Sequence, residues 1–276
     1  MRLDQLLVDR GFAATRTRAQ ALLLGGLVWV GAGDSARVDR KAGELVDPGI
    51  AVEVLAPDPY VSRGGYKLAA ALDAFGVDPA GRVCLDVGAS TGGFTDVLLQ
   101  RGARRVYALD VGRGQLADSL RRDPRVVSLE RTNARTLSAT TLPERVDLAT
   151  IDVSFISLRL VLGPVVSTIG PDGGSVVALV KPQFEAGRGE VPGGVVRDPA
   201  LHRATVEGVV ATAAGLGLHA LDVIASPIRG PEGNREFLLH LRVPSRAPAG
   251  GEPLLAASTG PSLADRILDV TRGEPS

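Results

Sequence analysis

Two lysines and two carboxylates lie at or near the ends of predicted strands. Asp152 and Lys181 each end or follow an apolar run, Lys67 precedes the first strand of this series, and Glu236 opens the last. Functional side chains of a doubly wound fold gather at the carboxyl edge of its sheet, so we expect the four to converge. A lysine can take a proton from a hydroxyl when a second cation lowers its pKa, while carboxylates hold ammonium groups in place. The set predicts group transfer to a hydroxyl, with Lys181 as the base or as the group that orients the hydroxyl.

Lysine is scarce in this chain, and its scarcity adds weight to the set. Of the 31 basic residues, only Lys41, Lys67 and Lys181 are lysines. Arginine cannot lose its proton at workable pH, whereas lysine can when its surroundings shift its pKa. Each of the four charged residues alone fits an ordinary ion pair at a strand end. Because two of only three lysines belong to the set, the four together favour catalysis.

A glycine-rich turn, GASTGGFTD at 88–96, follows the apolar run 83–87 and predicts a ligand held close to the backbone. The chain has neither G-x-G-x-x-G nor GK[ST] at this turn, which weakens the dinucleotide and P-loop interpretations. Asp110 ends the next strand, 22 residues after Gly88, and Asn133 follows the third. An acid at that point reaches ribose hydroxyls, so this ordered set is typical of S-adenosylmethionine binding.

The predicted donor-binding residues come from this turn and from the ends of the following strands. They are Asp86, Gly88, Ala89, Ser90, Thr91, Gly92, Gly93, Phe94, Thr95, Asp110, Val111, Asn133 and Asp152. A plain packing turn is the competing interpretation, and the two polar residues at matching strand ends weigh against it.

The methyl acceptor is predicted from what the chain lacks. Enzymes of this fold that methylate base nitrogens carry an Asp/Asn-Pro-Pro-aromatic box after the fourth strand, but here Asp152 is followed by Val153, Ser154 and Phe155. Enzymes that methylate pyrimidine carbon need a cysteine nucleophile. The single cysteine, Cys84, lies inside the first apolar run, where we expect a buried thiol. Both base-directed reactions are disfavoured, and the lysine–carboxylate set described above favours a ribose 2′-hydroxyl instead.

Strands and helices alternate through residues 63–243. Apolar strands are expected near 83–87, 105–111, 126–130, 146–153 and 175–182, with helical stretches between them. Two closing strands, 218–226 and 235–243, are separated only by a loop and should pair antiparallel. This order predicts an α/β fold of the doubly wound, Rossmann-like class I methyltransferase type.

Residues 1–57 are predicted to form a separate small α+β module, with two short helices followed by short alternating stretches. Acidic and basic residues number 31 each in the chain, so an RNA-binding surface must be a local cluster. The candidate phosphate contacts are Arg2, Arg16, Arg18, Lys41 and Arg63. Charge alone favours solvated arginines on a helix face, and it is the resemblance described below that favours RNA binding.

The joint at 58–62 is expected to be a linker, and the Pro- and Gly-rich segment 244–276 a flexible tail with one helical turn near ADRILDV. The chain opens without a signal-peptide pattern, and no apolar run approaches the ~18 residues of a membrane helix. We therefore expect a cytoplasmic protein, a monomer without a metal site.

Several long segments resemble one known family. They are SRGGYKL, CLDVGASTGGFTDVLLQRGA, DVGRGQL, DPRVVSLERTNAR, DVSFISL, LVKPQFEAG and ASPIRGPEGNREF, and the match extends to about residue 243. The chain resembles the TlyA (hemolysin A) family, in which an S-four-type RNA-binding domain precedes an FtsJ-like ribose methyltransferase domain. The N-terminal part of the resemblance rests on Arg2-Leu3-Asp4, Thr15-Arg16 and Gly26 with the valines after it.

The resemblance implies an activity and a partner. The family's Lys-Asp-Lys-Glu tetrad falls on Lys67, Asp152, Lys181 and Glu236. The family uses S-adenosylmethionine to methylate ribose 2′-oxygens of cytidine in ribosomal RNA of the large subunit, and actinobacterial members act on both subunits. Loss of that methylation confers resistance to capreomycin and viomycin.

The linker departs from the family pattern. Actinobacterial members carry Arg-x-Trp-Val before the SRG motif, whereas this chain has Asp58-Pro59-Tyr60-Val61. A coupling role for the linker and the choice of ribosomal subunit are therefore open. Two other functions are also open: a membrane-active hemolysin, as the family's older name suggests, and a non-catalytic RNA-binding assembly factor.

Overall fold

The computed structural model describes residues 1–33, 36–55, 58–187, 189, 191–246 and 261–272. The chain divides into two compact units, Met1–Pro59 and Tyr60–Ser276, hereafter the N-terminal and C-terminal units. The boundary falls inside the predicted joint at 58–62. No helix in the described residues is long and apolar enough to cross a membrane.

The N-terminal unit has two helices, α1 (Leu3–Asp9) and α2 (Arg16–Leu24), and a two-stranded antiparallel sheet of β1 (Val28–Val30) and β2 (Val52–Val54). Apolar side chains from both helices and from β1, among them Leu7, Leu22 and Val28, form its core. The predicted small α+β module is confirmed. One of the short alternating stretches, ARVDR at 36–40, was expected to add to this sheet and contributes a single bridge, between Arg37 and Val30.

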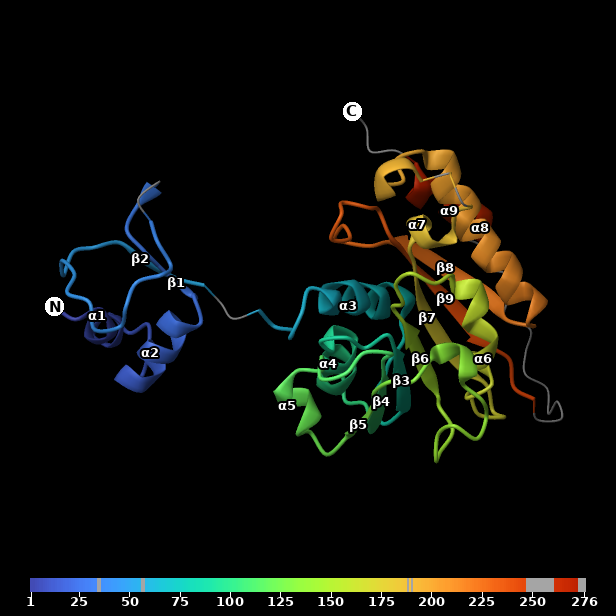
Figure 1. Cartoon of the computed structure of the whole chain (residues 1–276), viewed down its shortest axis with the longest axis horizontal. Helices are drawn as coiled ribbons and strands as arrows, with labels where there is room; N and C mark the ends of the chain where they lie inside the picture. Colours follow the sequence, from blue (N-terminus) through green and yellow to red (C-terminus); the bar gives the residue numbers. More distant parts are fainter. Residues whose placement is uncertain (34–35, 56–57, 188, 190, 247–260, 273–276) are drawn as a thin grey trace. The chain divides into compact units, whose positions relative to one another are not determined.

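The C-terminal unit is built on one seven-stranded sheet in the order β5-β4-β3-β6-β7-β9-β8 (Figure 1). The strands are β3 (Val83–Val87), β4 (Arg105–Leu109), β5 (Val126–Leu129), β6 (Leu148–Ile151), β7 (Gly174–Val180), β8 (His219–Ala225) and β9 (Phe237–Val243). The first five are parallel, while β9 pairs antiparallel with both β7 and β8. The doubly wound fold with a closing antiparallel pair is confirmed.

The strand order reverses between β3 and β6, and this reversal sets where a ligand can bind. From β3 the chain moves outward to β4 and β5, then returns to β6 on the other side of β3. The connections leave on opposite sides there, so a crevice opens beyond the carboxyl ends of the two strands.

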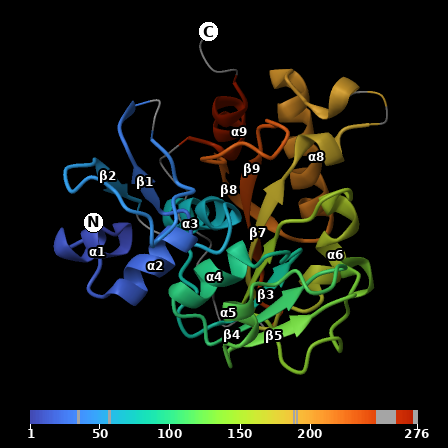
Figure 2. The same cartoon turned by 60° about the vertical axis from the view of Figure 1, so that its left-hand side comes forward.

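Helices cover both faces of the sheet. On one face lie α3 (Gly64–Phe75), α4 (Gly93–Gln100) and α5 (Asp118–Arg121); on the other lie α6 (Leu162–Val166) and α8 (Pro199–Gly215) (Figure 2). Each face has its own apolar cluster. In β3, Val83, Leu85 and Val87 join one cluster and Cys84 joins the other, which explains why this strand is apolar at nearly every position.

Two segments differ from the sequence predictions. Residues 64–75, for which no helix was predicted, form α3. The segment 244–276, expected to be a flexible tail with one helical turn near ADRILDV, contains at that place the longer helix α9 (Leu263–Thr271), which packs against β8 and begins with a capping box of Ser262 and Asp265. Ile267 of α9 is buried in the sheet's larger cluster. Residues 247–260 and 273–276 of that predicted tail lie outside the described residues.

The second half of the predicted linker belongs to the C-terminal unit. The backbone N–H of Val61 donates to Asp96 Oδ2 at 2.9 Å, and the Tyr60 ring stacks edge-on against Tyr66 with 5.3 Å between centroids. A Cβ on Gly65 would lie 2.3 Å from the Tyr60 ring, so only glycine admits the tyrosine here. Tyr60 and Val61 are therefore packed residues rather than free linker.

Candidate active site

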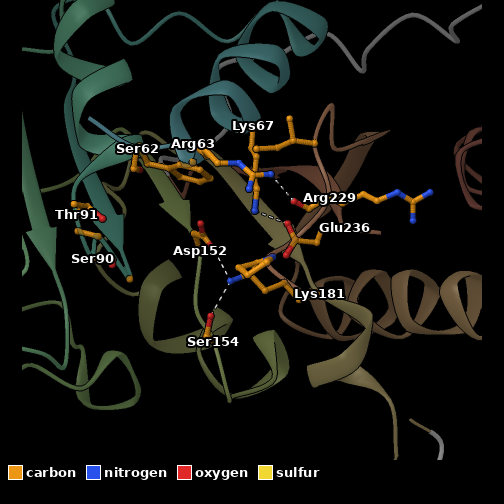
Figure 3. A pocket seen from close by; sticks show the side chains of 17 residues that line it. Ser62, Arg63, Lys67, Ser90, Thr91, Asp152, Ser154, Lys181, Arg229 and Glu236 are labelled. Atoms are coloured by element: carbon orange, nitrogen blue, oxygen red, sulfur yellow. Dashed lines mark hydrogen bonds and ion pairs between the residues drawn. The ribbon is translucent and has the colours of Figure 1, made fainter. Parts of the chain in front are cut away.

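The structure brings the four predicted charged residues together as two ion pairs. Lys67 lies on α3 and its Nζ is 2.5 Å from Oε2 of Glu236, which immediately precedes β9. Lys181 immediately follows β7, and its Nζ is 2.6 Å from Oδ1 of Asp152, which immediately follows β6. Asp152 Oδ1 makes this ion pair and has no hydrogen-bond partner among the described residues. Because β7 pairs with both β6 and β9, the two pairs face one space (Figure 3).

Both pairs are largely withdrawn from water. The side chains of Lys67 and Glu236 are 9% and 1% exposed, and those of Lys181 and Asp152 are 11% and 21% exposed. Lys181 also donates a hydrogen bond to Ser154 Oγ at 2.9 Å. A charge at such depth is stable only when it is paired and hydrogen-bonded, and both lysines meet that condition.

The two pairs line a pocket of about 480 Å³, hereafter the lysine pocket. Its wall also includes Ser62 and Arg63 before α3, Ser90 and Thr91 of the glycine-rich turn, and Arg229 from the loop before β9 (Figure 3). The pocket therefore joins cationic side chains to the turn that was predicted to hold a ligand.

Gly88 is required by close packing at the switch point. Its φ is +84°, and a Cβ there would lie 2.3 Å from the carbonyl oxygen of Asp152. Ser90 also has a left-handed backbone, with φ +47°, and its N–H donates to Asp110 Oδ2 at 2.8 Å. Asp110 Oδ1 accepts from Gly112 N–H at 2.7 Å. One carboxylate thus holds the glycine-rich turn against the loop after β4.

A second pocket of about 480 Å³, hereafter the glycine-turn pocket, lies beside the turn. Its wall comes from the carboxyl ends of β3, β4, β5 and β6. Of the residues predicted to bind the donor, it contains Gly88, Ser90, Asp110, Val111, Asn133 and Asp152. It shares Gly88, Ser90, Asp152 and Ser154 with the lysine pocket, so a ligand in one can reach a group held in the other.

The remaining predicted donor residues lie elsewhere. Ala89, Thr91, Gly93 and Phe94 line the lysine pocket, whereas Asp86, Gly92 and Thr95 are not among the described residues that line either pocket.

Asp86 is a buried support and not a wall residue. It is fully buried and accepts hydrogen bonds from Thr95 Oγ1 at 2.7 Å and from Thr150 Oγ1 at 3.2 Å. Burial raises the pKa of Asp86 to about 7, the nearby Asp152 adds to the rise, and the two threonine hydroxyls oppose it. The Asp86 carboxyl therefore ties the start of α4 to β6 from beneath the turn.

Sequence reasoning missed the aromatic residue at the pocket rim. The Phe155 side chain is 91% exposed and lines the glycine-turn pocket, and its φ of +64° is unusual for a bulky residue. Its ring lies 5.1 Å from that of Phe184. An exposed phenylalanine immediately after a strand end was the signal available in DVSF.

Glu185, also missed, fixes the loop that carries Phe155. This buried carboxylate accepts from Ser157 Oγ and from Leu158 N–H, both at 2.6 Å. Burial raises the pKa of Glu185, while these two hydrogen bonds and Arg159 oppose the rise. The loop after β6 is thereby tied to the short helix α7 (Pro182–Glu185) that follows Lys181.

The predicted RNA contacts of the N-terminal unit fall into two groups. Arg2 and Arg16 both bind the buried carboxylate of Asp4, at 2.9 and 3.2 Å. These contacts, with that to Arg2 the strongest, hold the pKa of Asp4 well below its usual range, although burial opposes them. The side chains of Arg2 and Arg16 remain about half exposed. Arg18 and Lys41 are exposed and make no such pair among the described residues. In the C-terminal unit, Arg63 is exposed at the lysine pocket.

Comparison with known proteins agrees with this geometry. Residues 60–243 match the FtsJ-like methyltransferase family, and residues 1–31 match the S4 domain. A 16S/23S rRNA (cytidine-2′-O)-methyltransferase TlyA from Mycobacterium tuberculosis is 50% identical over 243 residues, which cover 87% of this chain and 89% of the relative. The chain belongs to the TlyA family of FtsJ-like methyltransferases.

Other TlyA-family proteins match as fully. Hemolysin A of Brachyspira hyodysenteriae is 40% identical over 87% of this chain and 99% of its own length. A solved structure of a Streptococcus thermophilus protein that carries the name hemolysin is 41% identical, with a TM-score of 0.70, over 98% of this chain and 95% of that one. The predicted family and methyltransferase activity are confirmed.

Proposed function

We propose that this TlyA-family methyltransferase transfers a methyl group from S-adenosylmethionine to the ribose 2′-oxygen of cytidine in ribosomal RNA. The observation that carries the proposal is the pair of lysine–carboxylate contacts in the lysine pocket, directly beside the glycine-turn pocket. The 50% identical relative is named for this reaction on 16S and 23S rRNA. Such a substrate places the enzyme in the cytoplasm.

The glycine-turn pocket suits the donor in size and chemistry. Its volume of about 480 Å³ lies within the range of small-molecule sites. The Asp110 carboxylate would meet the ribose hydroxyls and Asn133 the adenine, while the backbone at Gly88 allows a ligand to approach closely. When bound, the donor supplies the methyl group as an electrophile on its sulfonium.

The lysine pocket suits a hydroxyl acceptor. Lys181 is held by Asp152 and Ser154. As a neutral amine it can align the attacking oxygen and receive its proton as the oxygen–carbon bond forms and the sulfur–carbon bond to the methyl group breaks. Lys67, fixed by Glu236, supplies positive charge facing the oxygen as that proton leaves. A cytosine carbon would need a thiol instead, and Cys84 is buried in β3, where burial raises the pKa of its thiol to about 12.

The N-terminal unit is proposed to dock on folded RNA through phosphates and shape. Arg18 and Lys41 are the contacts we favour, because Arg2 and Arg16 already hold Asp4. Single-stranded or flipped presentation would deliver the target ribose to the lysine pocket. The exposed Phe155, with Phe184 beside it, offers an aromatic face for the base of that nucleotide.

Labelled methyl transfer to separated ribosomal subunits tests the proposal. Purified enzyme, tritiated S-adenosylmethionine and unmethylated 30S or 50S subunits should give label in RNA with at least one subunit. The result also decides the choice of subunit that the sequence leaves open. Absence of label in both subunits, with donor binding intact, would favour a non-catalytic assembly factor.

A further inference from the structure

A third cavity of about 300 Å³, hereafter the arginine pocket, lies next to the lysine pocket in the C-terminal unit. Its polar wall residues are Arg197, His202, Arg229, Glu232 and Arg235. Arg229 lines both cavities. Its side chain extends away from the Lys67–Glu236 pair (Figure 3). The two cavities are therefore neighbours that share one residue.

The wall of the arginine pocket carries excess positive charge, with three arginines against Glu232. Arg235 donates to the carbonyls of Val270 and Arg272 at 3.0 and 2.6 Å, so its guanidinium is fixed at the end of α9. Arg229 donates to Gly233 O at 3.2 Å. Arg197 is exposed and has no ion-pair partner within the described ranges. Guanidinium groups arranged in this way suit an anion with several acceptor oxygens.

His202 adds an independent observation at the same cavity. The ring is 2% exposed, and Nε2 donates to Val196 O at 3.1 Å, because a carbonyl can only accept. That bond leaves Nδ1 buried without a hydrogen-bond partner among the residues that the structure describes. A buried polar atom of this kind is uncommon in folded proteins and often marks a missing ligand or ion.

The charges around His202 oppose its protonation while the cavity holds no anion. Burial lowers the pKa of His202, Arg235 and Arg229 lower it further, and the Val196 carbonyl and Asp198 oppose the change. Arg197 and Glu232 are the other charged groups on the wall. An anion among the arginines would offset their repulsion and favour a proton on Nδ1.

We propose that the arginine pocket binds a backbone phosphate of the substrate RNA adjacent to the nucleotide whose ribose occupies the lysine pocket. The proposal rests on the proposed function, since it takes RNA as the substrate. A ribose in a strand has a phosphate on either side, and Arg229 connects the two cavities. Such a contact fixes the register of the strand without reading its sequence.

Arg197→Gln tests the RNA contact. The KM for the ribosomal subunit that serves as substrate should rise about tenfold. The slope of log affinity against log salt concentration should decrease in magnitude by about one, the change expected for one lost phosphate contact. Donor affinity, measured by calorimetry, should not change. The matched control is Arg203→Gln: Arg203 lies on α8, six residues after Arg197 in the chain, pairs with Glu207 on the surface and is outside the cavity wall. Equal KM values and salt slopes in the two variants would overturn the proposal.

A titration of the histidine ring by NMR tests the cavity without RNA. Inorganic phosphate should raise the pH at which His202 protonates in the wild-type protein and should do so less in Arg197→Gln. His219 and His240 serve as internal references. If phosphate shifts His202 but the wild-type enzyme methylates neither subunit, the proposed function fails and the anion site stands. If the enzyme methylates a subunit while phosphate leaves the protonation pH of His202 unchanged, the proposal that the arginine pocket binds a phosphate is contradicted.

Discussion

Lys181 meets Asp152 Oδ1 and Ser154 Oγ, and an arginine in its place could keep both contacts but could not release a proton. Lys181→Arg should therefore lower kcat at least 100-fold, within the range that a general base contributes. Donor affinity should change less than threefold, because the proposed donor site is the glycine-turn pocket, which Lys181 does not line.

The comparison uses single-turnover rates on ribosomal subunits together with donor binding by calorimetry. Lys41→Arg, a like change at a surface lysine of the N-terminal unit, is the control and should retain kcat. A Lys181→Arg enzyme with wild-type kcat would show that Lys181 only orients the hydroxyl.

Asp86 gives a prediction about pH and stability. Its pKa in the folded state is about 7, above the 3.8 of an ordinary aspartate, so the unfolded chain releases this proton first as pH rises. The free energy of unfolding therefore falls as pH rises between these two pKa values, by about 2 to 3 kcal/mol from pH 5 to pH 7. Asp86→Asn keeps the side chain's size but cannot ionise. Urea unfolding of both proteins should show a stability gain for the variant that grows over this pH range. A gain independent of pH would contradict the assignment.

The residue identities of the site could be predicted from the sequence, but their pairing could not. Asp152 and Lys181 follow apolar runs, so their place at the carboxyl edge was predictable. That Lys67 pairs with Glu236, and Lys181 with Asp152, depends on β7 lying between β6 and β9. Strand order is set by packing between distant segments, and the spacing of residues along the chain does not encode it directly.

At the scale of elements, the turn after β3 sets how closely β3 and β6 approach at the switch point. Gly88→Ala would place a Cβ 2.3 Å from Asp152 O, so the turn or the strand end must move. We expect donor affinity to fall at least tenfold, in addition to a cost of about 1 to 3 kcal/mol for alanine at positive φ.

Gly217→Ala measures the cost of alanine at positive φ without the close contact that Gly88 makes. Gly217 has a similar φ of +78°, but a Cβ there would meet no atom within 4 Å, and Gly217 lines neither pocket. Calorimetric titration with the donor should show wild-type affinity in Gly217→Ala. Equal donor affinities in the two glycine variants would mean that close packing at Gly88 is not what shapes the pocket.

The helix α3 was not predicted from the sequence, and α9 was predicted only as one turn; both helices form for the same reason. α3 begins in Ser62-Arg63-Gly64-Gly65, residues that favour a joint, but its later turns bury Leu68 and Leu72 against the sheet. α9 follows a Pro- and Gly-rich stretch, and its stability comes from Ile267 and from Arg235 at its end. In both cases tertiary packing outweighs local composition.

At the scale of the whole molecule, the proposed function assigns docking to the N-terminal unit and chemistry to the C-terminal unit. Every residue that lines the lysine, glycine-turn and arginine pockets lies in the C-terminal unit, which has its own apolar clusters. Removal of residues 1–59 should leave donor affinity within about threefold and lower methylation of ribosomal subunits at least 100-fold, because phosphate contacts supply much of the affinity for RNA. Circular dichroism checks that the remaining unit is folded. A truncated enzyme as active as the full chain on intact subunits would remove the docking role.

The identity of the methylated nucleoside tests the central claim most directly. RNA from the labelled ribosomal subunit would be digested to nucleosides and separated by chromatography with mass detection. The arrangement of Lys67, Asp152, Lys181 and Glu236 predicts that the label co-migrates with 2′-O-methylcytidine. Label in 5-methylcytidine, or in any nucleoside methylated on its base, would contradict transfer to a ribose hydroxyl and with it the role assigned to the lysine pocket.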